Sequence, residues 1–187
     1  MDLVKSIGEP IGTLNPNDVG RKGWRLLEMA EVEEFNVPGG AVATTQVYES
    51  LADQVDLEWI DESGDVKLEE VQNTIDNNTD PNESLQDIYE TTKEEFLEAE
   101  LPEEFEDELN EVLSEYKLED GGYETEFVVR SNAVNEDRAD ASGAGKMKSK
   151  GGARTIDEIT EFYKEVCASA FSPDALESLM GEDNDLE

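Results

Sequence analysis

The chain has 187 residues, a length typical of one domain, and 36% of them are apolar. Its 49 acidic and 14 basic residues give a formal net charge of −35, so binding to nucleic acid or to an anionic membrane, which requires a basic surface, is not expected. One cysteine and no histidine exclude a disulfide within the chain, a zinc site of Cys/His type and a histidine-based catalytic triad.

The acidic residues are spread along the whole chain and do not form a tail. Repulsion between them is largely screened at about 1 M salt, where the Debye length falls to roughly 3 Å. We therefore predict a protein of a salt-adapted cytoplasm, with an ordinary acidic protein or a nucleic-acid mimic as alternatives. The start of the sequence lacks the apolar stretch of a signal peptide, and no apolar run approaches the length of a membrane span, which favours a cytoplasmic location.

The first fifty residues predict a turn-rich start, a helix, a strand and a second helix. Asn17 or Asp18 is expected to cap a helix over 22–34, where apolar residues recur at helical spacing. A Val-Pro-Gly-Gly turn then leads into a strand over 41–45. A threonine at the end of this strand is expected to cap the next helix.

The middle of the chain predicts three helices. The polar stretch 56–80 is expected to contain a short helix near 68–76, followed by a surface loop. Two amphipathic helices are predicted over 82–99 and from Pro102 to Tyr116, because their apolar residues fall on one helical face. Gly121 and the glycine after it are expected to end the second of these.

The last third predicts one strand, a long helix, and a short helix that starts at Ser172-Pro173 and ends at Leu179. The strand TEFVVRS, over 125–131, contains an apolar run that is expected to be fully buried. The Lys- and Gly-rich stretch 146–152 has no strand pattern and is expected to be a loop. Thr155 and Glu158 form a capping box at the start of a long helix, in which Cys167 is expected to pack in the core.

Helices with a few separated strands indicate an α/β or α+β fold in one domain over 1–180, followed by an acidic tail over 181–187. The few basic residues are unevenly placed: three of the fourteen lie within 21–25 and six lie within 130–154. Both stretches are also rich in glycine, which lets backbone amides approach an anion while cations neutralise it. They predict a site for a polyanionic ligand; the alternative is that the cations only relieve local repulsion.

Two segments resemble the ATP-binding domain of the phosphoenolpyruvate synthase and pyruvate phosphate dikinase family. Residues 18–51, beginning DVGRKGWRLLEMA, are similar to its Val-Gly-Gly-Lys-Gly turn, Leu-x-Glu-Met helix and Val-Pro-x-Gly turn. Residues 127–145, FVVRSNAVNEDRADASGAG, resemble its Val-Arg-Ser-Ser-Ala-Thr-x-Glu-Asp and Asp-Ala-Ser-Phe-Ala-Gly signature. The CASAFS stretch over 167–172 is similar to its Cys-Trp-Ala-Ser-Leu-Phe-Ser.

The resemblance implies an ATP-grasp-like first lobe, with helices packed on a small mixed sheet, that binds the phosphates of ATP. The family transfers a phosphoryl group to a histidine on a separate swivelling domain. Lys22 and Arg130 match its phosphate-contacting lysine and arginine, and fixed cations suit phosphate oxygens. The expected phosphate-binding residues are Lys22, Arg130, Ser131, Asn132, Gly143 and Gly145. Accessory roles are expected for Arg21, Glu136, Asp137 and Lys146.

The sequence also departs from the family pattern. Arg21 replaces the second glycine of the turn, Val134 replaces a threonine, and Gly143 replaces a phenylalanine. The family's second lobe, with the residues that hold Mg²⁺ and the adenine side, is not recognised here, so no catalytic residue and no metal ligand is assigned. We expect phosphoryl transfer only with a separately encoded second lobe or phosphohistidine domain. The alternatives are an inactive interaction or regulatory protein that keeps the fold, and a remnant reading frame.

Overall fold

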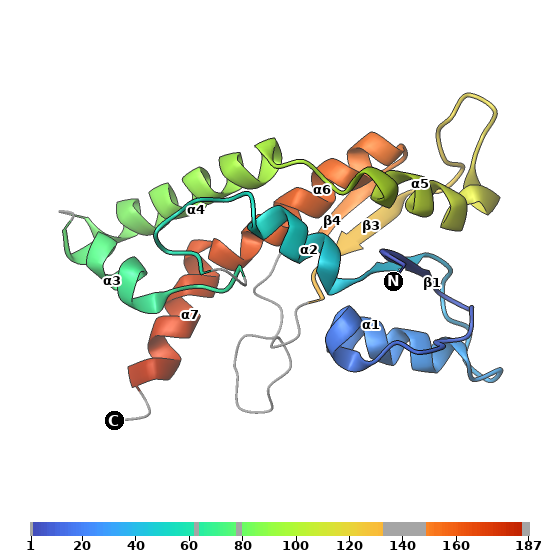
Figure 1. The fold of residues 1–187 in the computed structure, drawn as a ribbon, viewed down its shortest axis with the longest axis horizontal. Helices are drawn as coiled ribbons and strands as arrows, with labels where there is room; N and C mark the ends of the chain where they lie inside the picture. Colours follow the sequence, from blue (N-terminus) through green and yellow to red (C-terminus); the bar gives the residue numbers. More distant parts are fainter. Residues whose placement is uncertain (1, 62–63, 78–79, 133–148, 185–187) are drawn as a thin grey trace.

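The computed structural model describes residues 2–61, 64–77, 80–132 and 149–184, without the side chains at 82 and 182–184 (Figure 1). Its α-helices are α1 (Pro16–Ala30), α2 (Thr45–Ala52), α3 (Leu68–Asp76), α4 (Pro81–Glu98), α5 (Glu103–Val112), α6 (Ile156–Ala168) and α7 (Pro173–Asn184). Its strands are β1 (Val4–Ser6), β2 (Ala41–Ala43), β3 (Phe127–Arg130) and β4 (Ser149–Ala153), and short 3₁₀ helices cover Ser114–Tyr116 and Ser169–Phe171. Within these residues, no helix combines the length and the apolar character needed to cross a membrane.

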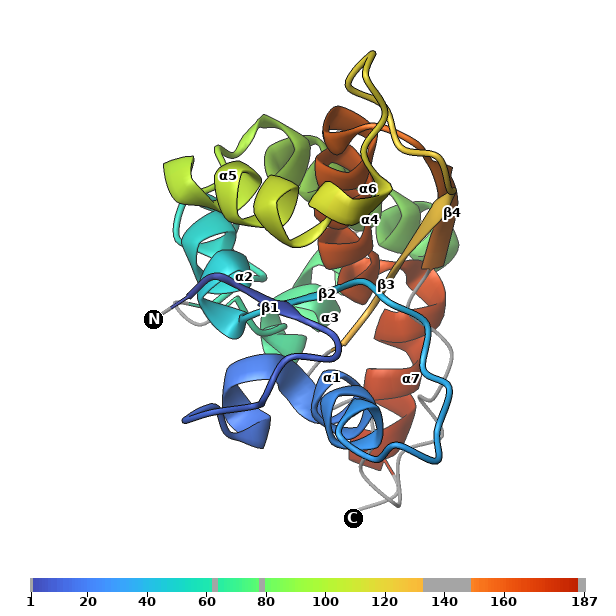
Figure 2. The same ribbon diagram turned by 90° about the vertical axis from the view of Figure 1, so that its right-hand side faces the viewer.

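The described part is a mixed α/β structure, but its strands do not form the expected small mixed sheet. They form two separate two-stranded sheets, β1–β2 and β3–β4, and both are antiparallel. The β1–β2 ribbon lies between α1 and α5 (Figure 2). Val4 of β1 packs toward Phe105 and Leu109, whereas Val42 of β2 packs with residues of α1. Each face of this ribbon is therefore covered by a different helix.

The β3–β4 hairpin corrects two expectations. The stretch 146–152 is not wholly a loop, because β4 begins at Ser149 and pairs with β3 despite its Lys- and Gly-rich sequence. The apolar run of β3 is not fully buried, since Val128 is 59% exposed. A two-stranded sheet has one face against α6 and the other open, so alternate residues of β3 point outward.

The central core is formed by helices. α4 and α6 run alongside each other (Figure 1), and their apolar faces enclose Phe96 and Phe171. The rings of Tyr48, Phe96 and Phe171 form a chain with centroid separations of 6.0 and 6.3 Å. A second cluster joins α3, α4 and α7 through fully buried side chains such as Val71 and Leu176. These helices agree with the apolar periodicity of the sequence, including the short helix predicted near 68–76.

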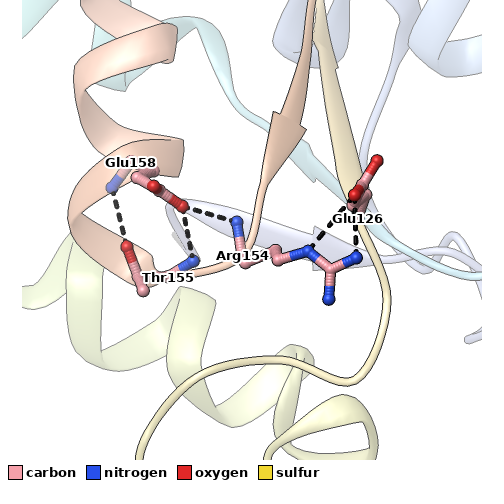
Figure 3. Close-up of polar contacts among 4 residues, drawn as sticks. All are labelled: Glu126, Arg154, Thr155 and Glu158. Atoms are coloured by element: carbon pink, nitrogen blue, oxygen red, sulfur yellow. Dashed lines mark hydrogen bonds and ion pairs between the residues drawn. The ribbon is translucent and has the colours of Figure 1, made fainter.

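The start of α6 confirms the predicted capping box (Figure 3). The Thr155 hydroxyl accepts a hydrogen bond from the Glu158 amide at 3.2 Å, and the Glu158 carboxylate accepts from the Thr155 amide at 3.2 Å. The same carboxylate accepts from the Arg154 amide at 2.7 Å. Three backbone N–H groups at the turn from β4 into α6 are thereby satisfied, which fixes the direction of the helix.

The other helix boundaries differ from the predicted ones by a turn or less at most ends. The helix predicted from Pro102 to Tyr116 stops at Val112, and a 3₁₀ turn continues it to Tyr116. α7 extends from Pro173 to Asn184, beyond the short helix that was expected. The helix predicted over 22–34 begins earlier and ends at Ala30, and the reason for its different start lies at the candidate site.

Candidate functional site

Helix α1 begins six residues before the predicted start and contains a sharp break. Asn15 caps it: the Asn15 side chain accepts from the Asn17 amide at 3.0 Å, and the Asp18 carboxylate accepts from the Asn15 amide at 2.8 Å. The expectation that Asn17 or Asp18 is the cap was therefore wrong, although Asp18 is the acidic partner of the capping box. Pro16, with its fixed φ, occupies the first helical position, and this sets the start of the helix.

The break in α1 lies at Gly20, whose φ of 68° and ψ of 162° are not helical. This backbone region is accessible essentially only to glycine. A Cβ built on Gly20 would lie 2.7 Å from the Asn132 Oδ1 atom, and a Cβ on Gly23 would lie 2.8 Å from the Val42 Cγ1 atom. The turn Gly20-Arg21-Lys22-Gly23 thus requires glycine at both ends, one for conformation and close approach and the other for close approach alone.

Asn132, two residues beyond the end of β3, inserts its side chain into this break. Its Oδ1 atom accepts a hydrogen bond from the Gly23 amide at 2.8 Å. Its Nδ2 atom donates to the carbonyl oxygen of Val19. Two segments more than one hundred residues apart in the sequence are thereby joined through both ends of one side-chain amide.

The candidate cations come from these two joined segments. Lys22 precedes Gly23 directly and is partly buried, whereas Arg130 is exposed at the last position of β3. Since one residue spans at most about 3.6 Å, the Cα atoms of Arg130 and Asn132 are no more than about 7 Å apart. The structure therefore brings the backbone positions of Lys22 and Arg130 to the same junction of α1 and β3. Ser131 lies between Arg130 and Asn132 and is partly buried.

Two other basic residues of the second cationic stretch are held in ion pairs. Lys150 of β4 pairs with the Glu165 carboxylate, which also lies 3.1 Å from the Lys93 ammonium. Arg154, beyond the far end of β4 from Arg130, pairs with Glu126 at 2.7 Å (Figure 3). For these residues the alternative interpretation applies, in which cations balance neighbouring carboxylates. Arg21 is exposed on α1.

The remaining expected site residues lie outside the described residues: Gly143, Gly145, Glu136, Asp137 and Lys146. Among the residues that are described, no group of three or more carboxylate or thiolate side chains is arranged to hold a metal ion. A pocket of about 570 Å³ between the start of α5 and α6 is lined by several carboxylates, among them Glu100, Glu103 and Glu161. Its charge is unsuited to a polyphosphate.

The sequence did not reveal that Asn132 and the two glycines fit together. The one available signal was the spacing of Gly20 and Gly23 beside two basic residues, which indicated an anion site but not its neighbour. Predicting this contact requires knowing which strand end lies against α1. Asn132 was expected to donate to phosphate, whereas the described contacts of its amide group are to the backbone of α1.

A glycine-requiring turn and a strand end, each next to a basic residue, meet in this small α/β domain. Residues 16–184 match the family model described as pyruvate phosphate dikinase, AMP/ATP-binding domain, and the chain belongs to this family. This confirms the resemblance of the two segments and implies nucleotide as the ligand class of the domain.

A relative agrees with the family match. The chain is 27% identical over 171 residues to a phosphoenolpyruvate synthase of Pseudomonas aeruginosa (strain UCBPP-PA14). The aligned region covers 90% of this chain and 20% of the relative, so the chain spans about one fifth of the length of the curated relative it matches. No solved structure matches the chain.

Proposed function

We propose that this chain binds the phosphate groups of ATP at the junction of α1 and β3, with Lys22 and Arg130 as the cationic contacts and Ser131 as a hydroxyl donor. The observation that carries the proposal is a pair of hydrogen bonds, in which the Asn132 side chain accepts from the Gly23 amide and donates to the Val19 carbonyl oxygen. These bonds hold the Arg130 strand end against the turn that carries Lys22. A triphosphate needs several fixed cations at one place, and this junction supplies them from two elements.

The net charge of −35 gives these few cations a particular importance. At low ionic strength the acidic surface repels a nucleotide, whereas molar salt screens exposed charges beyond about 3 Å and leaves close contacts less affected. We therefore expect measurable ATP binding in molar KCl. We propose, on the same grounds, that the protein is adapted to a salty cytoplasm, so that its unfolding midpoint rises as KCl is increased from 0.1 M.

The decisive variant is Arg130→Ala, measured by calorimetry in molar KCl. Loss of one charge-assisted contact should raise the ATP dissociation constant about tenfold. A larger effect is not expected, because Arg130 is exposed and molar salt weakens the contact. Arg154→Ala is the matched control, since it removes an arginine from the same hairpin at the end away from Lys22. Equal effects of the two variants, or a folded wild-type protein that binds no ATP, would contradict the proposal.

We propose further that the chain acts as an ATP-grasp-like first lobe and that phosphoryl transfer requires a second lobe and a phosphohistidine domain. The family resemblance assigns Gly143 and Gly145 to the phosphate-binding loop, with Arg21, Glu136, Asp137 and Lys146 as accessory residues and Mg²⁺ ligands on the second lobe. Incubation with labelled ATP, Mg²⁺ and pyruvate should give no phosphoenolpyruvate from this chain alone, and product formation would refute the requirement.

The second candidate function is an interaction or regulatory protein that keeps the fold without using the site. The observation in its favour is a short segment from the last turn of α1 to Phe35 with exposed apolar side chains, where Met29, Val32 and Phe35 are 44%, 41% and 54% exposed. This candidate predicts a stable complex with another protein that is unchanged by Arg130→Ala. The calorimetric comparison above separates the two functions.

A further inference from the structure

We infer that Asn132 is a positioning residue of the phosphate site: it caps the second part of α1 from outside the helix and so fixes Lys22 relative to Arg130. This inference deepens the proposed function and rests on it. In this inference Asn132 acts by positioning Lys22 and Arg130, whereas the sequence suggested that Asn132 contacts phosphate directly.

The broken helix lacks a side-chain acceptor of its own for the amide of Gly23. Because Gly20 is not helical, the helical part that follows begins at Arg21, and Gly23 is its third residue. The amides at the start of a helix have no acceptor within the helix, and the third one is usually satisfied by the side chain of the residue just before the helix. At this position stands Gly20, which has no side chain.

Asn132 supplies the missing acceptor. Its Oδ1 atom lies 2.8 Å from the Gly23 amide nitrogen, the hydrogen bond that a capping asparagine makes within its own helix. Its Nδ2 atom donates to Val19, in the turn before the break. A side-chain amide carries a donor and an acceptor a fixed distance apart, so one asparagine spans the break from both sides.

The Asn132 cap also affects the positions of the two cations, Lys22 and Arg130. Lys22 lies between the break and Gly23, so the orientation of its backbone depends on the hydrogen bond to Gly23. Arg130 lies two residues before Asn132 on the same strand end. The absence of a Cβ at Gly20 and Gly23 leaves room for the Asn132 side chain, and a methyl group at either position would overlap its amide. The geometry thus makes the spacing of the two cations depend on one side chain that bears no charge.

The test uses the full chain in molar KCl and reads two quantities, amide hydrogen exchange at Gly23 without nucleotide and the ATP dissociation constant. In Asn132→Ala, exchange at Gly23 should accelerate and ATP affinity should fall, each by about five- to tenfold, the equivalent of one helix cap. Asn17→Ala is the matched control, because Asn17 is an exposed asparagine in the first turn of the same helix. It should leave both quantities within about twofold of the wild type.

Asn132→Asp provides the rescue, because it keeps an oxygen acceptor for Gly23 while replacing the donor to Val19. Slow exchange at Gly23 should persist in this variant, and it serves as the test if Asn132→Ala does not fold. Unchanged exchange in a folded Asn132→Ala, or fast exchange in Asn132→Asp, overturns the cap. Faster exchange in Asn132→Ala with unchanged ATP affinity overturns the positioning role.

Failure of the wild-type protein to bind ATP refutes the proposed function, and with it the positioning role. Exchange at Gly23 still reports on the cap in that case, because it is measured without nucleotide. The two failures are therefore distinguishable.

Discussion

The junction of α1 and β3 and the helical core around Phe96 are stabilised in opposite ways. At the junction, few apolar side chains are buried, chiefly Val19, Leu27 and Val42. The geometry there is set by hydrogen bonds between the Asn132 side chain and the backbone of α1, and by the absence of Cβ atoms. In the helical core, large rings are buried and pack against one another. Substitutions in the core should therefore change mainly the free energy of unfolding, whereas substitutions at the junction should also change the geometry of a binding site.

The largest expected effect is that of Phe96→Ala. Phe96 is 0% exposed and packs against Tyr48 and Phe171, so its removal loses apolar burial and leaves a cavity. The free energy of unfolding should fall by about 3–5 kcal/mol, measured by urea denaturation in molar KCl. Phe35→Ala, at a 54% exposed phenylalanine, is the matched control and should change it by less than about 0.5 kcal/mol. Similar losses in both variants would show that the core does not determine stability.

Gly20→Ala tests the junction against a glycine of similar φ. Gly20 and Gly12 both have positive φ, at 68° and 71°, but only Gly20 lies against Asn132. Gly12→Ala should cost about 1 kcal/mol, the conformational penalty alone. Gly20→Ala should cost about 3 kcal/mol, because it adds a clash with Asn132 in a backbone region that only glycine occupies.

The two glycine variants are compared by thermal unfolding and by ATP affinity. Equal costs for the two would mean that contact with Asn132 contributes nothing. A loss of ATP affinity confined to Gly20→Ala would place the effect at the junction, as the proposed site requires.

The same two regions show how far the sequence could predict the structure. Helices of the core follow from local periodicity, and the capping box of Thr155 and Glu158 is confirmed because both partners lie within four residues. The strand β4 was missed because its one lysine and two glycines carry no strand pattern; it is a strand through its pairing with β3. The outward position of Val128 likewise depends on how many strands the sheet has, which no local pattern reveals.

The site was likewise predicted only in part, because one of its contacts joins segments far apart in the sequence. Two cationic, glycine-containing segments and their family resemblance indicated nucleotide, and the family match agrees. The cap that joins these segments depends on a contact across more than one hundred residues, and neither segment alone signals it. The expected roles of Lys22 and Arg130 remain predictions, which the variants above test.

Alkaline pH should weaken the core more than the junction. Burial raises the pKa of the Cys167 thiol to about 12, and burial likewise raises the pKa values of Tyr48 and Tyr163. The unfolded thiol ionises near pH 8.5, so its contribution to stability is complete below that pH and is lost as the pH rises toward 12. The free energy of unfolding should fall by at most about 1.4 kcal/mol per pH unit for this group.

The pH dependence is measured by urea unfolding between pH 8 and 11, in the wild type and in Cys167→Ala. The variant should lack the decline that begins near pH 9 in the wild type. It should keep the decline above pH 10, where the unfolded tyrosines ionise. A decline below pH 10 that is identical in both proteins would exclude Cys167 as its source.

The smallest expected effect is that of the ion pair at the far end of the β3–β4 hairpin. Arg154 and Glu126 form a hydrogen-bonded pair at 2.7 Å, but both side chains are more than half exposed. An exposed pair contributes about 0.5 kcal/mol at low salt, and molar KCl screens most of it. A double-mutant cycle with Arg154→Ala and Glu126→Ala at 0.1 M and at molar KCl should give a coupling energy that falls toward zero at the higher salt. A coupling energy that persists in molar salt would mean that the pair is structurally important, and Arg154 would no longer serve as a neutral control for Arg130.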